Sequence, residues 1–196
     1  MIRILSTIML AILFSHAYAQ NWTEKQIETA KTAQHIDNLT STEKECIMYI
    51  NLCRLYPQDF LKNEVLTYKT PQKYGDYLKN SSYLQSLIQL LSSMSPVGVL
   101  HFDSQSYIDA KCLAVEQGMA GTTGHTRINC SPVNYAECCS YGMETSKDIV
   151  MQLLIDHDVP SLGHRINCLN KSYSKIGVSI QPHTKWGTCA VIDMIW

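Results

Sequence analysis

Apolar residues recur at helical spacing along this chain between Cys46 and Asp156. Cys46, Ile50 and Cys53 fall on one face of a predicted helix, which the capping box Thr42–Glu45 opens and Pro57 ends. Three further helices follow from the same spacing. Their apolar positions are Leu84, Leu87, Leu90 and Leu91 in the second, Ile108, Cys112 and Val115 in the third, and Ile149, Leu153 and, in register with them, Asp156 in the fourth. We therefore expect a mainly helical first part of the chain.

The ends of these helices and the last third of the chain are marked by other signals. Asp103 is a natural N-cap for the third helix, and Pro160 ends the fourth, which begins near Ser146. Residues 176–180 and 188–195 are short apolar runs separated by Pro182 and Gly187, which predicts two strands joined by a turn. Helices followed by late strands indicate an α+β layered domain.

Two stretches lack a clear period. Residues 121–141 are polar and long for a loop, and long loops are often functional. Residues 20–40 are polar and weakly periodic, so we expect a loosely attached arm before the domain at 41–196. Trp186 and Trp196 flank the last predicted strand and are expected to pack.

The first nineteen residues predict export. Arg3, an apolar run from Ile4 to Phe14 and the small-x-small site Ala17–Ala19 are typical of a signal peptide. The run is too short to span a bilayer, and we expect a secreted protein, extracellular or periplasmic, with no transmembrane segment. Without Arg3, fifteen basic and seventeen acidic residues remain, a balance that offers no basic stripe for nucleic acid. We also expect a monomer.

Eight cysteines in an exported chain predict disulfides. Cys46 and Cys53 cannot pair with each other, since seven residues of helix separate them by about 10.5 Å and a disulfide needs Cα atoms within about 7 Å. The pairing is otherwise left open among the full set. That set is Cys46, Cys53, Cys112, Cys130, Cys138, Cys139, Cys168 and Cys189.

Four polar residues in the second half are the candidates for a site. His125 and His164 each follow a glycine, and Glu137 and Asp156 lie between them in the chain. Two imidazoles and two carboxylates are a donor set that Zn²⁺ accepts, with His125 and His164 as the first metal ligands to test. Each residue also has an ordinary interpretation, because a histidine can simply pack and a carboxylate at a helix end can simply be solvated.

Several motifs in order resemble one family. They are Asn51-x-x-Arg54-x-x-Pro57, Gly124-His125, Ala136-Glu137-Cys138, the segment from Asp148 to Asp156, Gly163-His164-Arg165-x-Asn167, and the strands at 176–178 and 189–193. This order resembles the CAP superfamily of cysteine-rich secretory, antigen 5 and pathogenesis-related proteins, also called SCP domains, in its bacterial Gly-His-Arg form. The family's Gly-Glu-Asn motif is Ala136-Glu137-Cys138 here, and its second glutamate is the shorter Asp156.

The resemblance implies a disulfide-containing three-layer α-β-α sandwich with a cavity lined by His125, Glu137, Asp156 and His164. It implies a secreted binding or interaction module that needs no cofactor, with a cavity for a divalent cation such as zinc or a small ligand. The partner would be a protein or a lipid-like molecule.

Two other hypotheses stay open. A metal held by the two histidines could activate water, with Glu137 as general base, which would make the protein a metal-dependent, peptidase-like hydrolase. We place this enzyme hypothesis behind binding. Alternatively, the four residues could form a hydrogen-bonded network whose only role is to attach the 121–141 loop to the fourth helix.

Overall fold

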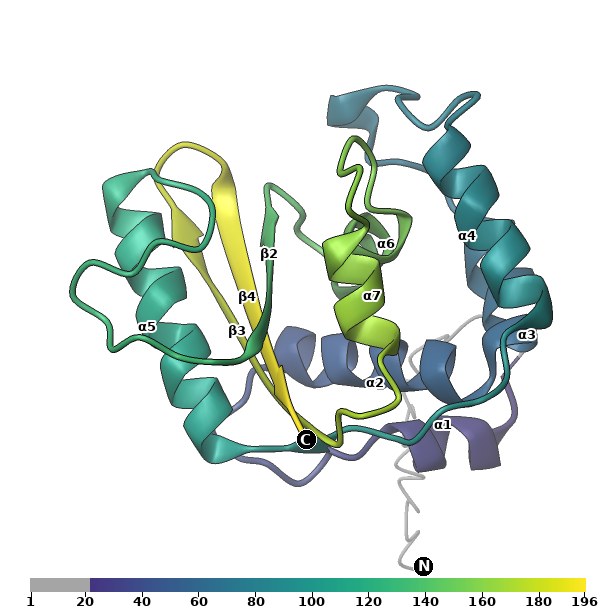
Figure 1. The fold of residues 1–196 in the computed structure, drawn as a ribbon, viewed down its shortest axis with the longest axis horizontal. Coiled ribbons are helices and arrows are strands. Elements are labelled where there is room, and N and C mark those ends of the chain that lie inside the picture. Colours follow the sequence, from purple (N-terminus) through teal and green to yellow (C-terminus); the bar gives the residue numbers. More distant parts are fainter. Residues whose placement is uncertain (1–21) are drawn as a thin grey trace, which may run out of the picture.

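The computed structural model describes residues 22–196, so the predicted signal peptide lies outside the described residues. The fold is mixed α/β around one four-stranded sheet (Figure 1). Its strands are β1 (His101–Phe102), β2 (Ala136–Tyr141), β3 (Lys175–His183) and β4 (Gly187–Ile195). No helix in this part of the chain is both long and apolar enough to cross a membrane.

The sheet has the order β1-β3-β4-β2, in which β1 is parallel to β3 and the other pairs are antiparallel. The predicted strands at 176–180 and 188–195 are confirmed as the hairpin β3–β4. β2 lies inside the stretch that the sequence predicted as a loop. Its six residues pair with the edge of β4 opposite to β3, and β4 is about fifty residues away in the chain.

Of the segment at 20–40, which we expected to be a loosely attached arm, residues 22–40 pack against the domain. It contains α1 (Glu24–Ala30), and Ala30, Ala33 and Leu39 belong to the main hydrophobic core. Trp22 donates a hydrogen bond of 2.7 Å to Glu64, which ties the start of the described chain to the domain. Trp22, Ile27 and Ile36 also pack against this core, so the segment is part of the domain.

The first predicted helix is α2 (Ser41–Leu55), and its apolar face is confirmed, with Cys46, Ile50 and Cys53 fully buried. The capping box is not the predicted one. Thr40 is the N-cap, and Glu43 accepts from its backbone N–H and hydroxyl. The two boxes overlap in sequence, and the burial of Glu43 favours the earlier one. The chain then continues through short helices and a long one. These are α3 (Pro57–Phe60), the π-helix η1 (Leu61–Val65), the 3₁₀ turn η2 (Gln72–Tyr74) and α4 (Ser82–Ser93).

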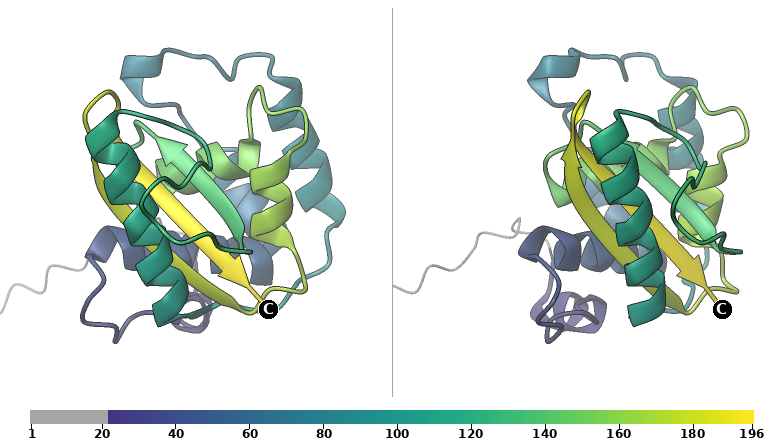
Figure 2. Two further views of the ribbon diagram at one scale, coloured as in Figure 1. Left: turned by 60° about the vertical axis from the view of Figure 1, so that its left-hand side comes forward. Right: turned by 90° about the vertical axis from the view of Figure 1, so that its left-hand side faces the viewer.

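Helix α5 (Ser104–Ala120) covers one face of the sheet, along β3 and β4 (Figure 2). Asp103 is its N-cap, as predicted, but the predicted apolar face is wrong. Ile108 and Val115 are exposed, and the buried face is instead made mostly of small side chains. A Cβ on Gly177 of β3 would lie 2.1 Å from the backbone nitrogen of Tyr107. The helix therefore approaches the sheet too closely for large residues at the contact.

The opposite face of the sheet packs against α2, α6 (Ser146–Ile155) and α7 (Gly163–Leu169). Neighbouring residues of β4 show the division. Val191 belongs to the small hydrophobic cluster under α5, and Ile192 belongs to the main core with α2 and α6. Alternate side chains of a strand point to opposite faces, so both faces of this sheet are covered. The fourth predicted helix is thus confirmed, although it ends at Ile155, before Pro160.

Only part of the expected disulfide framework is present. Cys112 and Cys130 form a disulfide with an S–S distance of 2.06 Å. The other six cysteines are buried free thiols in the structure: Cys46, Cys53, Cys138, Cys139, Cys168 and Cys189. Five of them have no exposed surface, which means that they fill the core as small apolar side chains.

Candidate functional site

His125 lies in the loop between α5 and β2, and two side chains, Tyr141 and Gln117, hold the peptide of Gly124 that precedes it. The Tyr141 hydroxyl accepts from the Gly124 backbone N–H at 2.9 Å and donates to the side-chain oxygen Oε1 of Gln117 at 2.7 Å. The Gln117 amide nitrogen donates to the Gly124 carbonyl. Gln117 is buried on α5 and Tyr141 ends β2, so two elements position the loop between them.

Glu137 orients the His125 ring. Nδ1 of His125 lies 2.8 Å from Oε1 of Glu137, and this hydrogen bond raises the pKa of His125. The second Glu137 oxygen accepts from the buried guanidinium of Arg127. Arg127 also donates to the Asp109 carbonyl at 3.0 Å. The sequence analysis did not single out Arg127, although its position two residues after His125 in a polar loop was a usable signal.

Asp193 lies opposite Glu137 in the pairing of β2 with β4, and the two acids share Arg127. Asp193 has no exposed surface, and burial, together with the Glu137 charge, raises its pKa to about 8. Its Oδ1 has no hydrogen-bond partner among the described residues. Arg127 thus lies between two carboxylates and offsets part of the repulsion between them.

Asp156 orients the second histidine. Its Oδ1 lies 2.7 Å from Nδ1 of His164, and its Oδ2 accepts from the backbone N–H groups of His164 and Arg165 at 3.0 and 3.3 Å. Asp156 does not continue the apolar face of α6, as the sequence suggested. It is the left-handed C-cap of that helix, with φ of 56°. Its buried carboxylate accepts hydrogen bonds from the first turn of α7.

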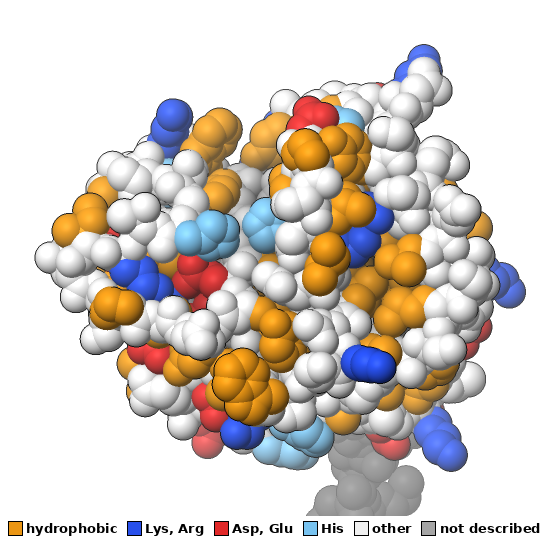
Figure 3. All heavy atoms as spheres, in the orientation of Figure 1, with side chains coloured by type: hydrophobic (Ala, Val, Ile, Leu, Met, Phe, Trp, Pro, Cys, Tyr) orange, Lys and Arg blue, Asp and Glu red, His pale blue; other side chains and the backbone are white. Residues whose placement is uncertain are grey.

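The two histidines face one cavity. Their ring centroids are 6.4 Å apart, and both rings line a cavity of about 650 Å³ together with Asp156, Cys139 and Gln152. Figure 3 shows histidine side chains close together at the hollow in this face of the molecule. The structure therefore brings together all four predicted residues, His125 and Glu137 from one side and Asp156 and His164 from the other.

Aromatic and apolar side chains form the rest of the cavity wall. Tyr74, Tyr77, Tyr141 and Trp186 line it, with Met143 among the apolar residues. Trp186 is 43 % exposed and Trp196 is 69 % exposed, so neither is the buried packing residue that we expected. Because these residues come from segments far apart in the chain, sequence spacing offered no signal for this wall.

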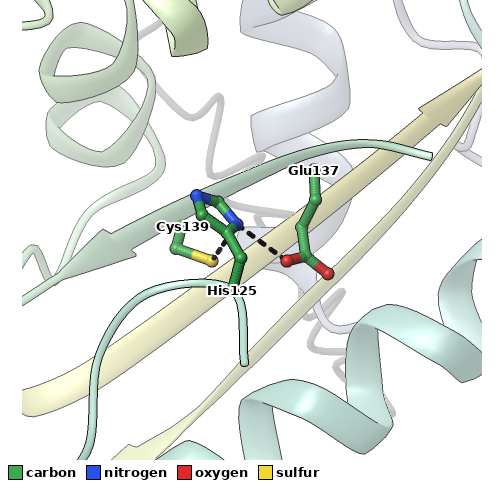
Figure 4. Close-up of side chains that lie close together, drawn as sticks. All are labelled: His125, Glu137 and Cys139. Carbon is green, nitrogen blue, oxygen red and sulfur yellow. Dashed lines mark hydrogen bonds and ion pairs between the residues drawn. The ribbon is translucent and has the colours of Figure 1, made fainter. Parts of the chain in front are cut away.

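A group of three possible metal ligands lies at one side of the cavity. Nδ1 of His125, a carboxylate oxygen of Glu137 and Sγ of Cys139 all lie within 4.8 Å of one another (Figure 4). His125 is the exposed member, and Cys139 is buried. This group could hold a metal ion, and Cys139 is a candidate ligand that the sequence analysis had assigned only to disulfide formation.

The other motif residues have structural contacts. The Arg54 guanidinium is fully buried and donates to the carbonyls of Gly98, Cys168, Asn170 and Tyr173 at 2.7–2.9 Å. Asn51 on the same helix accepts from the Leu100 backbone N–H at 2.8 Å, which places the chain before β1.

Arg165 is also buried and forms hydrogen bonds to the end of α6 and to α4. It donates to the carbonyls of Leu154 and Ile155 at the end of α6, at 2.6 and 2.7 Å, and to Ser86 of α4 at 2.8 Å. It thus places α7, and with it His164, against α6 and Asp156.

The chain matches no protein-family model, and no curated protein is similar to it in sequence. The fold and the site therefore rest on the geometry given above.

Proposed function

We propose that this protein is a secreted binding module of the CAP, or SCP, type. Two observations support the proposal. Segments that resemble the motifs of that family follow in the same order from Asn51 to Asp193. The structure has helices on both faces of a sheet, the arrangement that a three-layer α-β-α sandwich requires. We also propose that residues 1–19 are a signal peptide that is cleaved on export, and that the protein is active as a monomer.

The observation that supports a cation-binding role is the orientation of the two imidazoles. Each gives its Nδ1 to a carboxylate, Glu137 for His125 and Asp156 for His164. Neither Nε2 is hydrogen-bonded within residues 22–196. Histidines that ligate metals typically donate the other ring N–H to a carboxylate, which fixes the tautomer and ring position. The free Nε2 atoms are the ligands that we propose for a divalent cation such as zinc.

The spacing suits one ion. Zinc–nitrogen bonds are about 2.0–2.1 Å long, and rings with centroids 6.4 Å apart can reach one ion between them after a small change in side-chain torsions. The ion would leave coordination positions open to the cavity. A small ligand with an acidic or carbonyl head could complete the coordination, while its apolar part contacts the aromatic wall.

The hydrogen bonding of both carboxylates favours binding over hydrolysis. Glu137 accepts from His125 and Arg127, and Asp156 accepts from His164 and from two backbone N–H groups. A general base for water needs a free lone pair directed at the substrate. Each carboxylate is already engaged in orienting its histidine, so we rank the peptidase-like hydrolase second.

Zinc titration of the full chain tests the cavity. We expect one Zn²⁺ per molecule, and His164→Gln should lower the affinity at least about tenfold, since it removes one of two proposed protein ligands. His35→Gln changes an exposed histidine elsewhere and should bind zinc as the unmodified protein does. Equal affinities for all three proteins would refute the cavity site.

A further inference from the structure

Cys139 and His125 approach each other at Nδ1, the ring nitrogen that the proposed cavity ion does not use. Sγ of Cys139 lies 3.8 Å from Nδ1 of His125, the same atom that contacts Oε1 of Glu137 at 2.8 Å. In Figure 4 both dashed lines start from this one nitrogen, and the other ring nitrogen points elsewhere. One ring thus presents two nitrogens to two different surroundings.

We infer that Nδ1 of His125, Glu137 and Cys139 form a second, thiolate-containing cation site, which competes with the cavity site for the His125 ring. The ligand set stands on its own geometry, whereas the competition rests on the proposed function of the cavity. The class of ligand is a soft or borderline divalent cation, such as Zn²⁺, Cd²⁺ or Co²⁺, because a thiolate binds these ions better than Mg²⁺ or Ca²⁺.

The positions of the three atoms agree with tetrahedral coordination. Bond lengths of about 2.3 Å to sulfur and about 2.0–2.2 Å to nitrogen and oxygen place ligand atoms about 3.3–3.7 Å apart. The S···N distance of 3.8 Å is already close to this value. The N···O distance of 2.8 Å is that of a hydrogen bond, and it must open by about half an ångström when an ion replaces the proton.

The other contacts of the ligands permit this exchange. Arg127 holds the second oxygen of Glu137, so Oε1 can bind an ion without leaving the carboxylate unsupported. The Cys139 thiol donates to the Gly124 carbonyl at 3.4 Å, a weak bond whose loss costs little. The His125 side chain is 57 % exposed and Glu137 is 9 % exposed, so an ion enters past the imidazole.

The proton balance of the binding step is simple. Cys139 loses its thiol proton to solvent as the metal–sulfur bond forms, and the Nδ1 proton of His125 moves by exchange with water to Nε2. The imidazole stays neutral, and no oxidant or reductant is needed. With a proton on Nε2, His125 can no longer ligate an ion in the cavity, so occupation of the inner site disables the proposed His125–His164 site.

Cobalt spectroscopy separates the two sites, because only a thiolate ligand produces an intense sulfur-to-cobalt charge-transfer band in the near ultraviolet. We expect the band when Co²⁺ is added to the full chain. It should be absent in Cys139→Ala, with Co²⁺ affinity at the inner site at least about tenfold lower. Cys46→Ala removes another buried thiol, far from the site, and should keep the band. Far-ultraviolet circular dichroism checks that each variant is folded, and Cys139→Ser serves as the alternative if Cys139→Ala is not.

His164→Gln distinguishes failure of this inference from failure of the proposed function. A band that persists in His164→Gln and disappears in Cys139→Ala supports the inner site. Cobalt binding without the band, weakened by His164→Gln, overturns the inner site and leaves the cavity proposal intact. A band unaffected by Cys139→Ala also overturns the inner site. No cobalt or zinc binding by the unmodified protein overturns both.

Discussion

The carboxylate of Asp156 joins the end of α6 to the start of α7, the helix that holds His164. It accepts from the His164 ring and from two backbone N–H groups while it caps α6 in a left-handed conformation. Aspartate and asparagine are among the few residues that adopt this backbone conformation readily. Replacing Asp156 by asparagine therefore removes the negative charge and one acceptor oxygen without straining the backbone.

We predict that Asp156→Asn lowers both stability and zinc affinity. Asparagine offers one acceptor oxygen for three donors, and a buried donor left unpaired costs about 1–3 kcal/mol. The loss of the carboxylate behind His164 should reduce zinc affinity about 10–100-fold. Urea unfolding and zinc titration measure the two effects.

Asp158→Asn is the matched control for this prediction. Asp158 also has a positive φ, of 60°, but its side chain is 83 % exposed. The control should change the unfolding free energy by less than about 0.5 kcal/mol. If the two variants unfold and bind zinc alike, the assigned role of Asp156 is wrong.

At the scale of elements, the close approach of α5 to the sheet decides where the His125 loop begins. Gly177 on β3 faces the start of the helix, and Gly118 near its end lies where a Cβ would be 2.1 Å from the Pro182 carbonyl oxygen. Two contacts of this kind, at opposite ends, fix both the distance and the tilt of α5. Gln117, one residue before the second contact, then reaches Gly124 and Tyr141.

We predict that Gly177→Ala destabilises the protein by about 1–3 kcal/mol or more, because the new methyl group would overlap the α5 backbone and not a flexible side chain. Urea unfolding measures the loss. Gly98→Ala is the control, since a Cβ there meets no atom within 4 Å and its φ is not positive. That variant should keep its stability or gain up to about 1 kcal/mol. Equal stability of the two variants would contradict the packing argument.

At the scale of the whole molecule, one disulfide closes the loop that presents the first histidine. Cys112 lies on α5 and Cys130 lies 18 residues later, and the segment between them contains both His125 and Arg127. The loop has little regular structure, so this covalent link and the contacts of Gly124 restrict its conformations.

We predict that the double variant Cys112→Ser/Cys130→Ser loses about 2–4 kcal/mol of stability. Zinc affinity should fall as well, because His125 then samples more positions. Thermal or urea unfolding and zinc titration check both effects. Mild reduction of the unmodified protein should reproduce them, because the other described cysteines are already thiols. A stability loss with unchanged zinc affinity would mean that the disulfide does not position His125.

Sequence patterns predicted the helices and the hairpin that form from nearby residues. The periodicity of Cys46, Ile50 and Cys53 and the cap at Asp103 are local signals, and so is the turn between β3 and β4. The four candidate residues were chosen by their type and by a family resemblance, and the structure places them in two neighbouring histidine–carboxylate pairs. The predicted apolar face of α5 was wrong. Ile108 and Val115 were expected to be buried because they are large and apolar, but small residues meet the sheet instead.

The sequence alone determined which side chains are available, two imidazoles and two carboxylates, and the helix that ends just before Asp156. Only the tertiary structure decided their partners, with Glu137 bonded to His125 and Arg127, Asp156 bonded to His164, and Cys139 beside the His125 ring. The physical reason is that strand pairing and helix docking bring together residues that are distant in the chain. β2 meets β4 across about fifty residues, and spacing along a chain holds no information about such contacts.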